Sequence, residues 1–120
     1  MLPFKNRLTK RKDHEKVQRL GDFFSANNIA IKVLKNNTQD VRVGIVVGIK
    51  FSKKAVERNL AKRAMRDAIH TELKNLKKGF DVVVMARKKD EEKTKNINFK
   101  KDIFTVLKKG SLLMNTEKYL

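Results

Sequence analysis

A one-sided excess of positive charge limits the folds that are open to this chain. Lys and Arg contribute 30 residues and Asp and Glu only 13, so the formal net charge is +17 over 120 residues. Because like charges repel one another in a compact state, the chain has to bury its apolar residues and hold its charges outside the core. Hydrophobic residues make up 40% of the sequence, which is enough for one core. We predict a single domain over residues 1–120.

The same charge narrows the class of partner. An excess of one sign indicates a polyanion, and nucleic acid is the leading candidate. An acidic membrane surface is disfavoured, since no apolar run approaches the roughly 20 residues that a membrane helix needs and residues 1–7 lack an apolar stretch of signal-peptide length. The sequence has no cysteine, which excludes disulfides and thiolate metal sites. We expect a cytoplasmic protein with no membrane partner.

Three segments have the pattern of β-strands. Apolar side chains recur at every second residue over 29–34 and over 41–47, and residues 80–86 form the most apolar stretch. Residues 36–40 are rich in turn formers and separate the first two strands. Residues 49–51 either extend the second strand or begin a third, and the pattern leaves both possibilities open.

Two shorter helices and the chain ends complete the pattern. Thr9 is expected to cap a first helix that ends near Gly21, and Asn98 to cap a last helix that stops at Gly110. The other segments are expected to form a basic arm, a charged loop and a frayed tail, namely residues 1–8, 87–96 and 111–120. Strands mixed with helices, and a sheet that needs cover on one face only, predict an α+β or α/β sandwich of two layers.

The longest helix is predicted to begin after a Ser52 cap and to end near Leu76, with Gly79 as its C′ residue. Each residue turns a helix by about 100°, so four side chains form one line: Arg58, Lys62, Arg66 and His70. The apolar residues are predicted to face the core: Val56, Leu60, Ala61, Ala64, Met65 and Ala68. Like charges at this spacing destabilise a helix by roughly 0.2–0.5 kcal/mol per pair. Since Arg grips phosphate in two places, we interpret the line as a phosphate-binding face.

Residues 54–67, which read KAVERNLAKRAMRD, resemble the signature helix of bacterial ribonuclease P proteins. That signature is roughly Ala-Val-x-Arg-Asn-x-x-Lys-Arg-x-x-Arg-Glu. The resemblance covers about residues 3–113 in order, with matches to the N-terminal stretch, the first helix, the second strand and the fourth strand of the family: Asn6-Arg7-Leu8, Val17 and Gly21, Arg42-Val43-Gly44, and residues 80–87.

The resemblance implies both a fold and a function. The fold is a four-stranded, mainly antiparallel sheet packed with three helices, with a left-handed βαβ crossover, as in the second domain of a small-subunit ribosomal protein. The function is that of the protein component of ribonuclease P, an endoribonuclease that removes the 5′ leader of precursor tRNA and leaves a 5′-phosphomonoester. The implied partners are the catalytic RNA and precursor tRNA. The chemistry and most of the binding of Mg²⁺ would belong to the RNA, and no small-molecule cofactor is implied.

The resemblance also assigns RNA contacts. Those to the catalytic RNA fall on the signature helix and just before it: Lys53, Lys54, Arg58, Asn59, Lys62, Arg63 and Arg66. A cleft between the first helix and the sheet would hold the single-stranded leader, with these expected residues: Lys10, Lys12, His14, Gln18, Lys32 and Arg87. The chain departs from the family at position 60, which is often Arg. It also departs at His14, Gln18 and Lys32, where the family tends to have aromatic residues that stack on bases.

We expect no catalytic or metal site in the protein itself. His14 and His70 are far apart in the sequence and lack ligand spacing, and Asp90, Glu91 and Glu92 are typical of a solvated loop. Two other classes remain open. A double-stranded RNA-binding domain would lack a strand such as residues 80–86 between two helices. A ribosomal or architectural RNA-binding protein without an enzymatic partner is compatible with the composition, although the signature helix argues against it.

Overall fold

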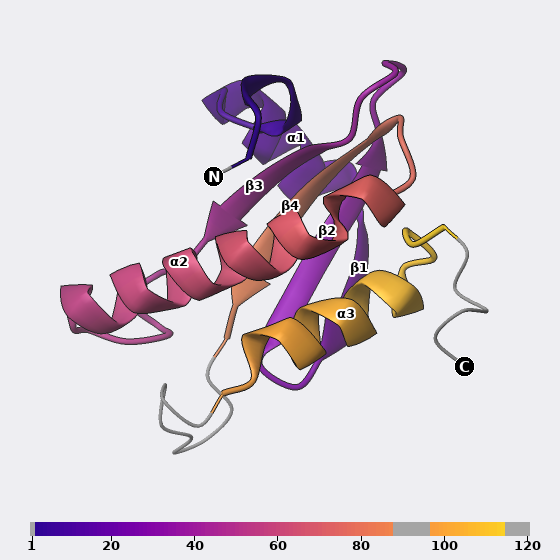
Figure 1. The fold of residues 1–120 in the computed structure, drawn as a ribbon. Helices are drawn as coiled ribbons and strands as arrows, with labels where there is room; N and C mark the ends of the chain where they lie inside the picture. The colour runs from indigo at the N-terminus through magenta and orange to yellow at the C-terminus, as the bar shows by residue number, and fades with distance from the viewer. Residues whose placement is uncertain (1, 88–96, 115–120) are drawn as a thin grey trace.

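Four strands form one mixed sheet in the computed structural model, which describes residues 2–87 and 97–114 (Figure 1). They are β1 (Asp22–Ala26), β2 (Ile29–Lys35), β3 (Arg42–Val46) and β4 (Phe80–Ala86). Their order across the sheet is β1-β2-β4-β3. β2 is antiparallel to both β1 and β4, whereas β3 is parallel to β4. Together with three helices, this arrangement confirms the predicted α+β class and the mainly antiparallel sheet.

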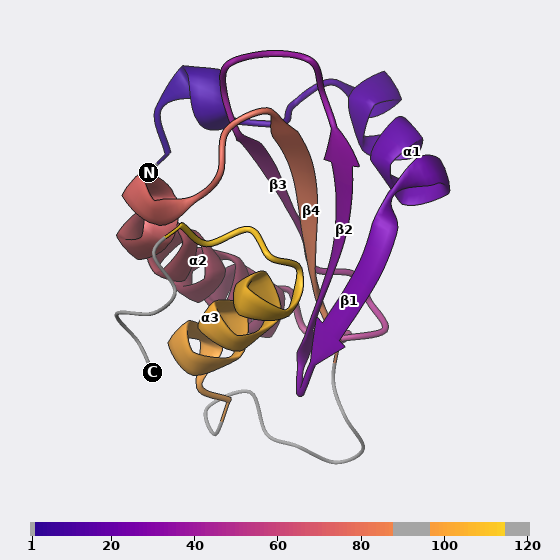
Figure 2. The same ribbon diagram turned by 90° about the vertical axis from the view of Figure 1, so that its right-hand side faces the viewer.

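The helices lie on both faces of the sheet. They are α1 (Arg11–Leu20), α2 (Ala55–Glu72) and α3 (Phe99–Lys109). Figure 2 shows α2 and α3 together on one face and α1 on the opposite face. The prediction that one face alone needs cover is wrong, because the outer face also carries apolar side chains. Val83 on that face is fully buried against Val17 of α1 and Leu8, with Leu34 and Met85 beside them.

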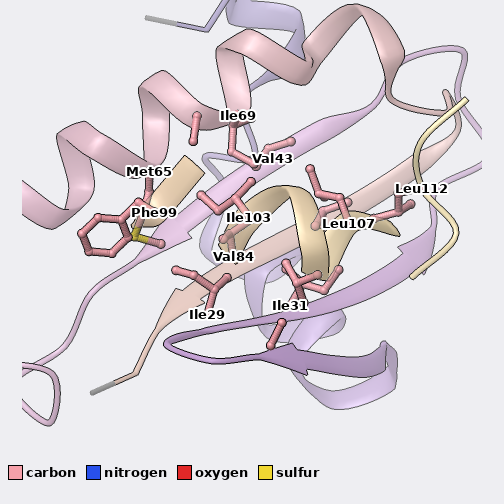
Figure 3. Packing of buried hydrophobic residues seen from close by; sticks show 14 of the residues in the cluster. Ile29, Ile31, Val43, Met65, Ile69, Val84, Phe99, Ile103, Leu107 and Leu112 are labelled. Carbon is pink, nitrogen blue, oxygen red and sulfur yellow. The ribbon is translucent and has the colours of Figure 1, made fainter. Parts of the chain in front are cut away.

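The main core lies between the sheet and the pair α2 and α3 (Figure 3). Alternate residues of the two central strands point into it, and the helices meet them with large apolar side chains: Ile29, Ile31, Val84, Met65, Ile69, Ile103 and Leu107. The intervening residues of the same strands face α1. Strands β2 and β4 are therefore buried on both sides. The alternation read from the sequence is therefore an alternation between two cores.

α1 ends at Gly21 as predicted, but of the predicted N-terminal caps only that of α3 is correct. Asn98 Oδ1 accepts the N–H of Lys101 at 3.0 Å. α1 begins two residues after Thr9, with Lys10 at its cap position. α2 begins at Ala55 rather than directly after Ser52, whose hydroxyl instead stabilises the preceding turn by accepting the N–H of Lys54 at 3.1 Å.

Several predicted boundaries also change in the folded chain. β1 was not predicted, because its sequence Asp-Phe-Phe-Ser-Ala has no alternation. Because β1 adds a strand before the two that were predicted first, Arg42-Val43-Gly44 belongs to the third strand and not to the second. Residues 49–51 are a turn. α2 gives way at Glu72 to the short 3-10 helix η2 (Leu73–Asn75), so Gly79, with a φ of +89°, lies in the turn before β4 and is not a helix cap.

The chain ends are packed more closely than the sequence indicates. Residues 2–8 contain the 3-10 helix η1 (Phe4–Asn6), and Leu2, Asn6 and Leu8 are buried. The N–H of Leu8 donates to Val43 O at 3.0 Å, so this segment lies along β3 and is not an irregular arm. At the other end, Leu112 and Leu113 are buried, and residues 111–114 do not fray. The predicted loop beyond Arg87 as far as residue 96, and the tail from residue 115, lie outside the described residues.

A buried ion pair joins β3 to β4. Asp81, with 5% of its surface exposed, accepts hydrogen bonds from Arg42 Nε at 2.8 Å and Nη2 at 2.6 Å. It also accepts one from Asn36 Nδ2 at 2.8 Å. The hydrogen bonds from Arg42 to Asp81 are the main cause that raises the pKa of Arg42 above its ordinary value. The Arg42 guanidinium therefore stays charged at every pH near neutrality.

Replacing Asp81 with Ala should lower the free energy of unfolding by about 2–3 kcal/mol. Removing one partner of a fully buried pair costs roughly 3–5 kcal/mol, and the value here is lower because Arg42 is partly hydrated. Urea unfolding measures the change. Glu15→Ala is the control, because its exposed pair with Arg11 contributes less than about 0.5 kcal/mol. Equal effects from the two variants would contradict the assignment of Asp81 as a structural anchor.

Candidate nucleic-acid interface

The cationic face of α2 carries most of the residues that were expected to contact the catalytic RNA. Asn59, Arg63 and Arg66 are exposed, and Arg58 and Lys62 are half-buried beside the core-facing stripe. Within the described ranges, none of these basic side chains forms an ion pair. Lys53 and Lys54, just before the helix, are also exposed. The face is thus accessible, and no described carboxylate neutralises it by an ion pair.

Arg58 has a second role that the sequence does not reveal. Its Nη1 donates to Ser52 O at 3.0 Å, which ties the first turn of α2 to the preceding loop. Mutation of Arg58 would therefore lower the stability of the fold as well as affect any contact with RNA.

The apolar half of α2 is narrower than predicted. Ala61, Met65 and Ala68 are buried as expected, but Val56 is 71% exposed and Leu60 is 52% exposed. Figure 1 shows that the start of α2 extends beyond the sheet, so these early turns have no strand to pack against.

The expected leader cleft begins where α1 crosses the outer face of the sheet. His14 Nε2 lies 2.5 Å from Leu8 O, and the imidazole packs so closely on Gly44 that a side chain at position 44 would collide with it. One turn later, Gln18 Nε2 donates to Met85 Sδ at 3.5 Å. Lys32 Nζ donates to Gln18 O at 2.5 Å. The structure therefore brings His14, Gln18 and Lys32 together between α1 and the sheet.

The other three expected cleft residues are not gathered with them. Lys10 and Lys12 are exposed at the start of α1, and no described contact links either to Lys32. Arg87 follows the end of β4, where its Nε donates to Asn27 O at 3.3 Å in the turn between β1 and β2. These cations lie at the two ends of the cleft region and not within it.

An exposed aromatic residue, which the sequence pattern does not single out, lies beside Lys32. Phe23 of β1 is the register partner of Lys32, so their side chains project from the same face of the sheet. It is 55% exposed. The signal was available as two adjacent phenylalanines, but only the register of β1 shows that Phe24 packs toward the core and Phe23 faces outward.

Comparison with known proteins decides the family. The Ribonuclease P family model matches residues 2–111. The chain belongs to the ribonuclease P protein family. The ribonuclease P protein component of Pseudanabaena sp. (strain PCC 6903) is 44% identical over 85 residues, which cover 70% of this chain and 73% of the relative. That of Dehalococcoides mccartyi (strain CBDB1) is 42% identical over 84 residues, covering 70% and 68%.

Solved structures of ribonuclease P proteins have the same fold. The protein from Thermotoga maritima is 32% identical with a TM-score of 0.76, covering 86% of this chain and 96% of that one. The protein from Staphylococcus aureus is 26% identical with a TM-score of 0.75, covering 94% and 96%. Membership of this family replaces the double-stranded RNA-binding and ribosomal alternatives.

Two further properties of the described residues bear on function. No helix among them is long and apolar enough to cross a membrane. No three of their His, Asp or Glu side chains gather as ligands for a metal ion.

Replacing Arg63 with Ala should weaken binding of ribonuclease P RNA and lower the slope of log affinity against log salt by roughly 0.7–0.9, if one counterion is released per contact. The free energy of unfolding of the Arg63 variant should differ from that of the unaltered chain by less than about 0.5 kcal/mol, because the Arg63 side chain is exposed. Arg58→Ala should weaken binding and also destabilise the fold, because it loses the bond to Ser52 O. Salt titrations and urea unfolding check both. An unchanged slope in both variants would mean that the cationic face of α2 is only solvated and does not bind the RNA.

Proposed function

We propose that this chain, as a protein component of ribonuclease P, binds the catalytic RNA through the cationic face of α2 and the 5′ leader of precursor tRNA beside α1. The observation that carries the first part is the row of basic side chains on α2 without an ion-pair partner among the described residues. Phosphate groups of an RNA are the partners that such a face fits best. Because a ribonucleoprotein of this kind works on cellular tRNA, we expect the cytoplasm as its location.

The protein's part in the reaction is binding and orientation, and the RNA subunit carries the chemistry. This division is supported by the side chains present, since the described residues contain no His, Asp and Glu cluster of metal-ligand type. Mg²⁺, when bound, would supply charge stabilisation and an activated water. We assign it mainly to the RNA. The chain itself contributes cations that lower the repulsion between the two RNA molecules.

Leader binding is assigned to the outer face of the sheet next to α1. Lys32 can attract the leader backbone, but its Nζ is held by Gln18 O, which limits its reach. Phe23 stands beside it with an exposed ring and offers a stacking surface for one base. Stacking is therefore reduced relative to a cleft with several aromatic residues but is not absent.

Reconstitution tests the function as a whole. At low Mg²⁺, the purified chain should increase cleavage of precursor tRNA by its cognate ribonuclease P RNA, because its cations replace part of the screening that Mg²⁺ supplies. The chain without RNA should not cleave. Rates of product formation with and without the chain measure both effects. RNA-free protein that cleaves after thorough purification would contradict the assignment of chemistry to the RNA, and no effect of the chain would contradict its role as the subunit.

Replacing Phe23 with Ala should reduce affinity for precursor tRNA in the reconstituted enzyme about fivefold or more, because a stacked base contributes about 1–3 kcal/mol. Affinity for mature tRNA, which has no leader, should not change. Phe4→Ala is the control, since Phe4 is an equally large ring that is 80% exposed on the N-terminal segment. Equal binding of precursor by the Phe23 variant and the unaltered chain would place the leader elsewhere.

A further inference from the structure

A cavity of about 330 Å³ opens at the β3 edge of the sheet, where four parts of the chain meet. It is lined by the N-terminal segment, α1, β3 and α2, through Leu2, Arg7, Leu8, Thr9, His14, Val43, Gly44, Ile45 and Arg66. β3 is an edge strand, and the N-terminal segment pairs with it only near Val43. The cavity lies where that pairing stops, so the edge beyond it is left uncovered by the segment.

The charged side chains that line this cavity are all basic. Arg7 and Arg66 each contribute a guanidinium group, and none of the lining residues is a carboxylate. Arg7 uses its Nε to donate to Leu2 O at 2.7 Å, and no bond to its terminal nitrogens is found among the described residues. Arg66 is exposed and has no hydrogen-bond or ion-pair partner in the same part of the chain. Two cations therefore share one cavity without a neutralising group.

A neighbouring cluster contains an arginine, Arg42, whose charge is neutralised by carboxylates. Arg42 lies close by, in a second hollow that also includes Arg7 and Asp13. Its guanidinium is bound by Asp81 and lies 3.4 Å from Asp13. That arginine is a structural element between two strands. Neither Arg7 nor Arg66 forms an ion pair with a described carboxylate, and an anion is the group that would complete them.

The shape of the cavity narrows the anion. The guanidinium group of an arginine grips two oxygens of a phosphate in a bidentate manner. The rest of the lining is mostly apolar, with Leu8 and Ile45 among it, and also holds the polar side chains of Thr9 and His14. The apolar part suits a base better than a second charge. The imidazole of His14 is held against Gly44 and Leu8 O and forms one rigid wall. A phosphate with an attached organic group fits this lining better than a bare inorganic ion.

We propose that this cavity binds one nucleotide, with its phosphate between Arg7 and Arg66 and its sugar and base along the apolar wall. Arg66 belongs to the cationic face of α2, and His14 belongs to the cleft beneath α1. The cavity therefore joins the two RNA-binding surfaces around the β3 edge. The nucleotide is either part of a bound RNA, a source that rests on the proposed function, or a free mononucleotide.

Amide chemical shifts of the full-length chain, followed during titration with uridine 5′-monophosphate, test the site. The amides of Thr9, Gly44 and Ile45 should shift together and saturate. Uridine without phosphate should not bind, and inorganic phosphate should bind at least threefold more weakly than the mononucleotide. Shifts that do not include these three amides would overturn the proposal. Equal binding of inorganic phosphate would overturn the role of the apolar wall.

Two pairs of variants separate the cavity from general positive charge. Arg66→Gln should weaken mononucleotide binding at least tenfold, whereas Arg63→Gln on the same helix, outside the cavity, should change it less than twofold. Thr9→Glu places a carboxylate at an exposed wall position and should abolish binding. Lys12→Gln changes the net charge by the same amount outside the cavity and should have little effect. Equal losses within either pair would overturn the proposal, because the chain would then bind the nucleotide by net charge.

Binding of ribonuclease P RNA by the Thr9 and Lys12 variants identifies the source of the nucleotide. A loss of more than tenfold for Thr9→Glu alone assigns the cavity to a nucleotide of the RNA. Unchanged RNA affinity, with mononucleotide binding lost, assigns it to a free nucleotide and leaves the site itself supported. Failure of mononucleotide to bind at all would overturn the cavity proposal without touching the proposed function, which the cleavage assay measures separately.

Discussion

The parallel pairing of β3 with β4 is the constraint on which the rest of the structure depends. Two parallel neighbours cannot be joined by a tight turn, so the chain must leave one end of the sheet and return to the other. Residues 47–79 make that crossover, and α2 is its main part. The pairing thereby sets a long, exposed helix across the β3 side of the sheet. On that helix, Arg63 and Arg66 are exposed to solvent, and Arg58 and Lys62 are half-buried.

A second consequence of this sheet order is that its two central strands are buried on both faces. β2 and β4 lie between other strands, and their side chains alternate between the large core under α2 and α3 and the smaller cluster under α1. α1 is therefore needed for stability, not only for binding. Its position depends on Gly44, since any side chain there would displace His14. The same contact that seats the helix forms a wall of the cavity at the β3 edge.

The treatment of charge differs between the interior and the surface. Where an arginine links strands, carboxylates surround it, as at Arg42 with Asp81 and Asp13. Where arginines face outward on α2 or line the β3-edge cavity, ion pairs with carboxylates are missing from the described residues. A protein with a net charge of +17 accepts repulsion at these places. Binding of a polyanion removes that repulsion, which makes the unpaired cations informative about function and the paired one informative about fold.

The sequence by itself determined the features that depend on neighbours along the chain. The strands around Ile31 and Val83, the cap at Asn98 and the basic line of α2 all follow from periodicity and local hydrogen bonding, and the family resemblance rested on the same stretches. Only the tertiary structure decided which residues are covered. Val56 and Leu60 have the right spacing for a core but are exposed, and the start of their helix extends beyond the sheet. Likewise, Arg7, His14 and Arg66 come from three distant segments and meet only through the packing of those segments around β3, because burial and proximity depend on where neighbouring elements end and on strand register, which a local pattern does not encode.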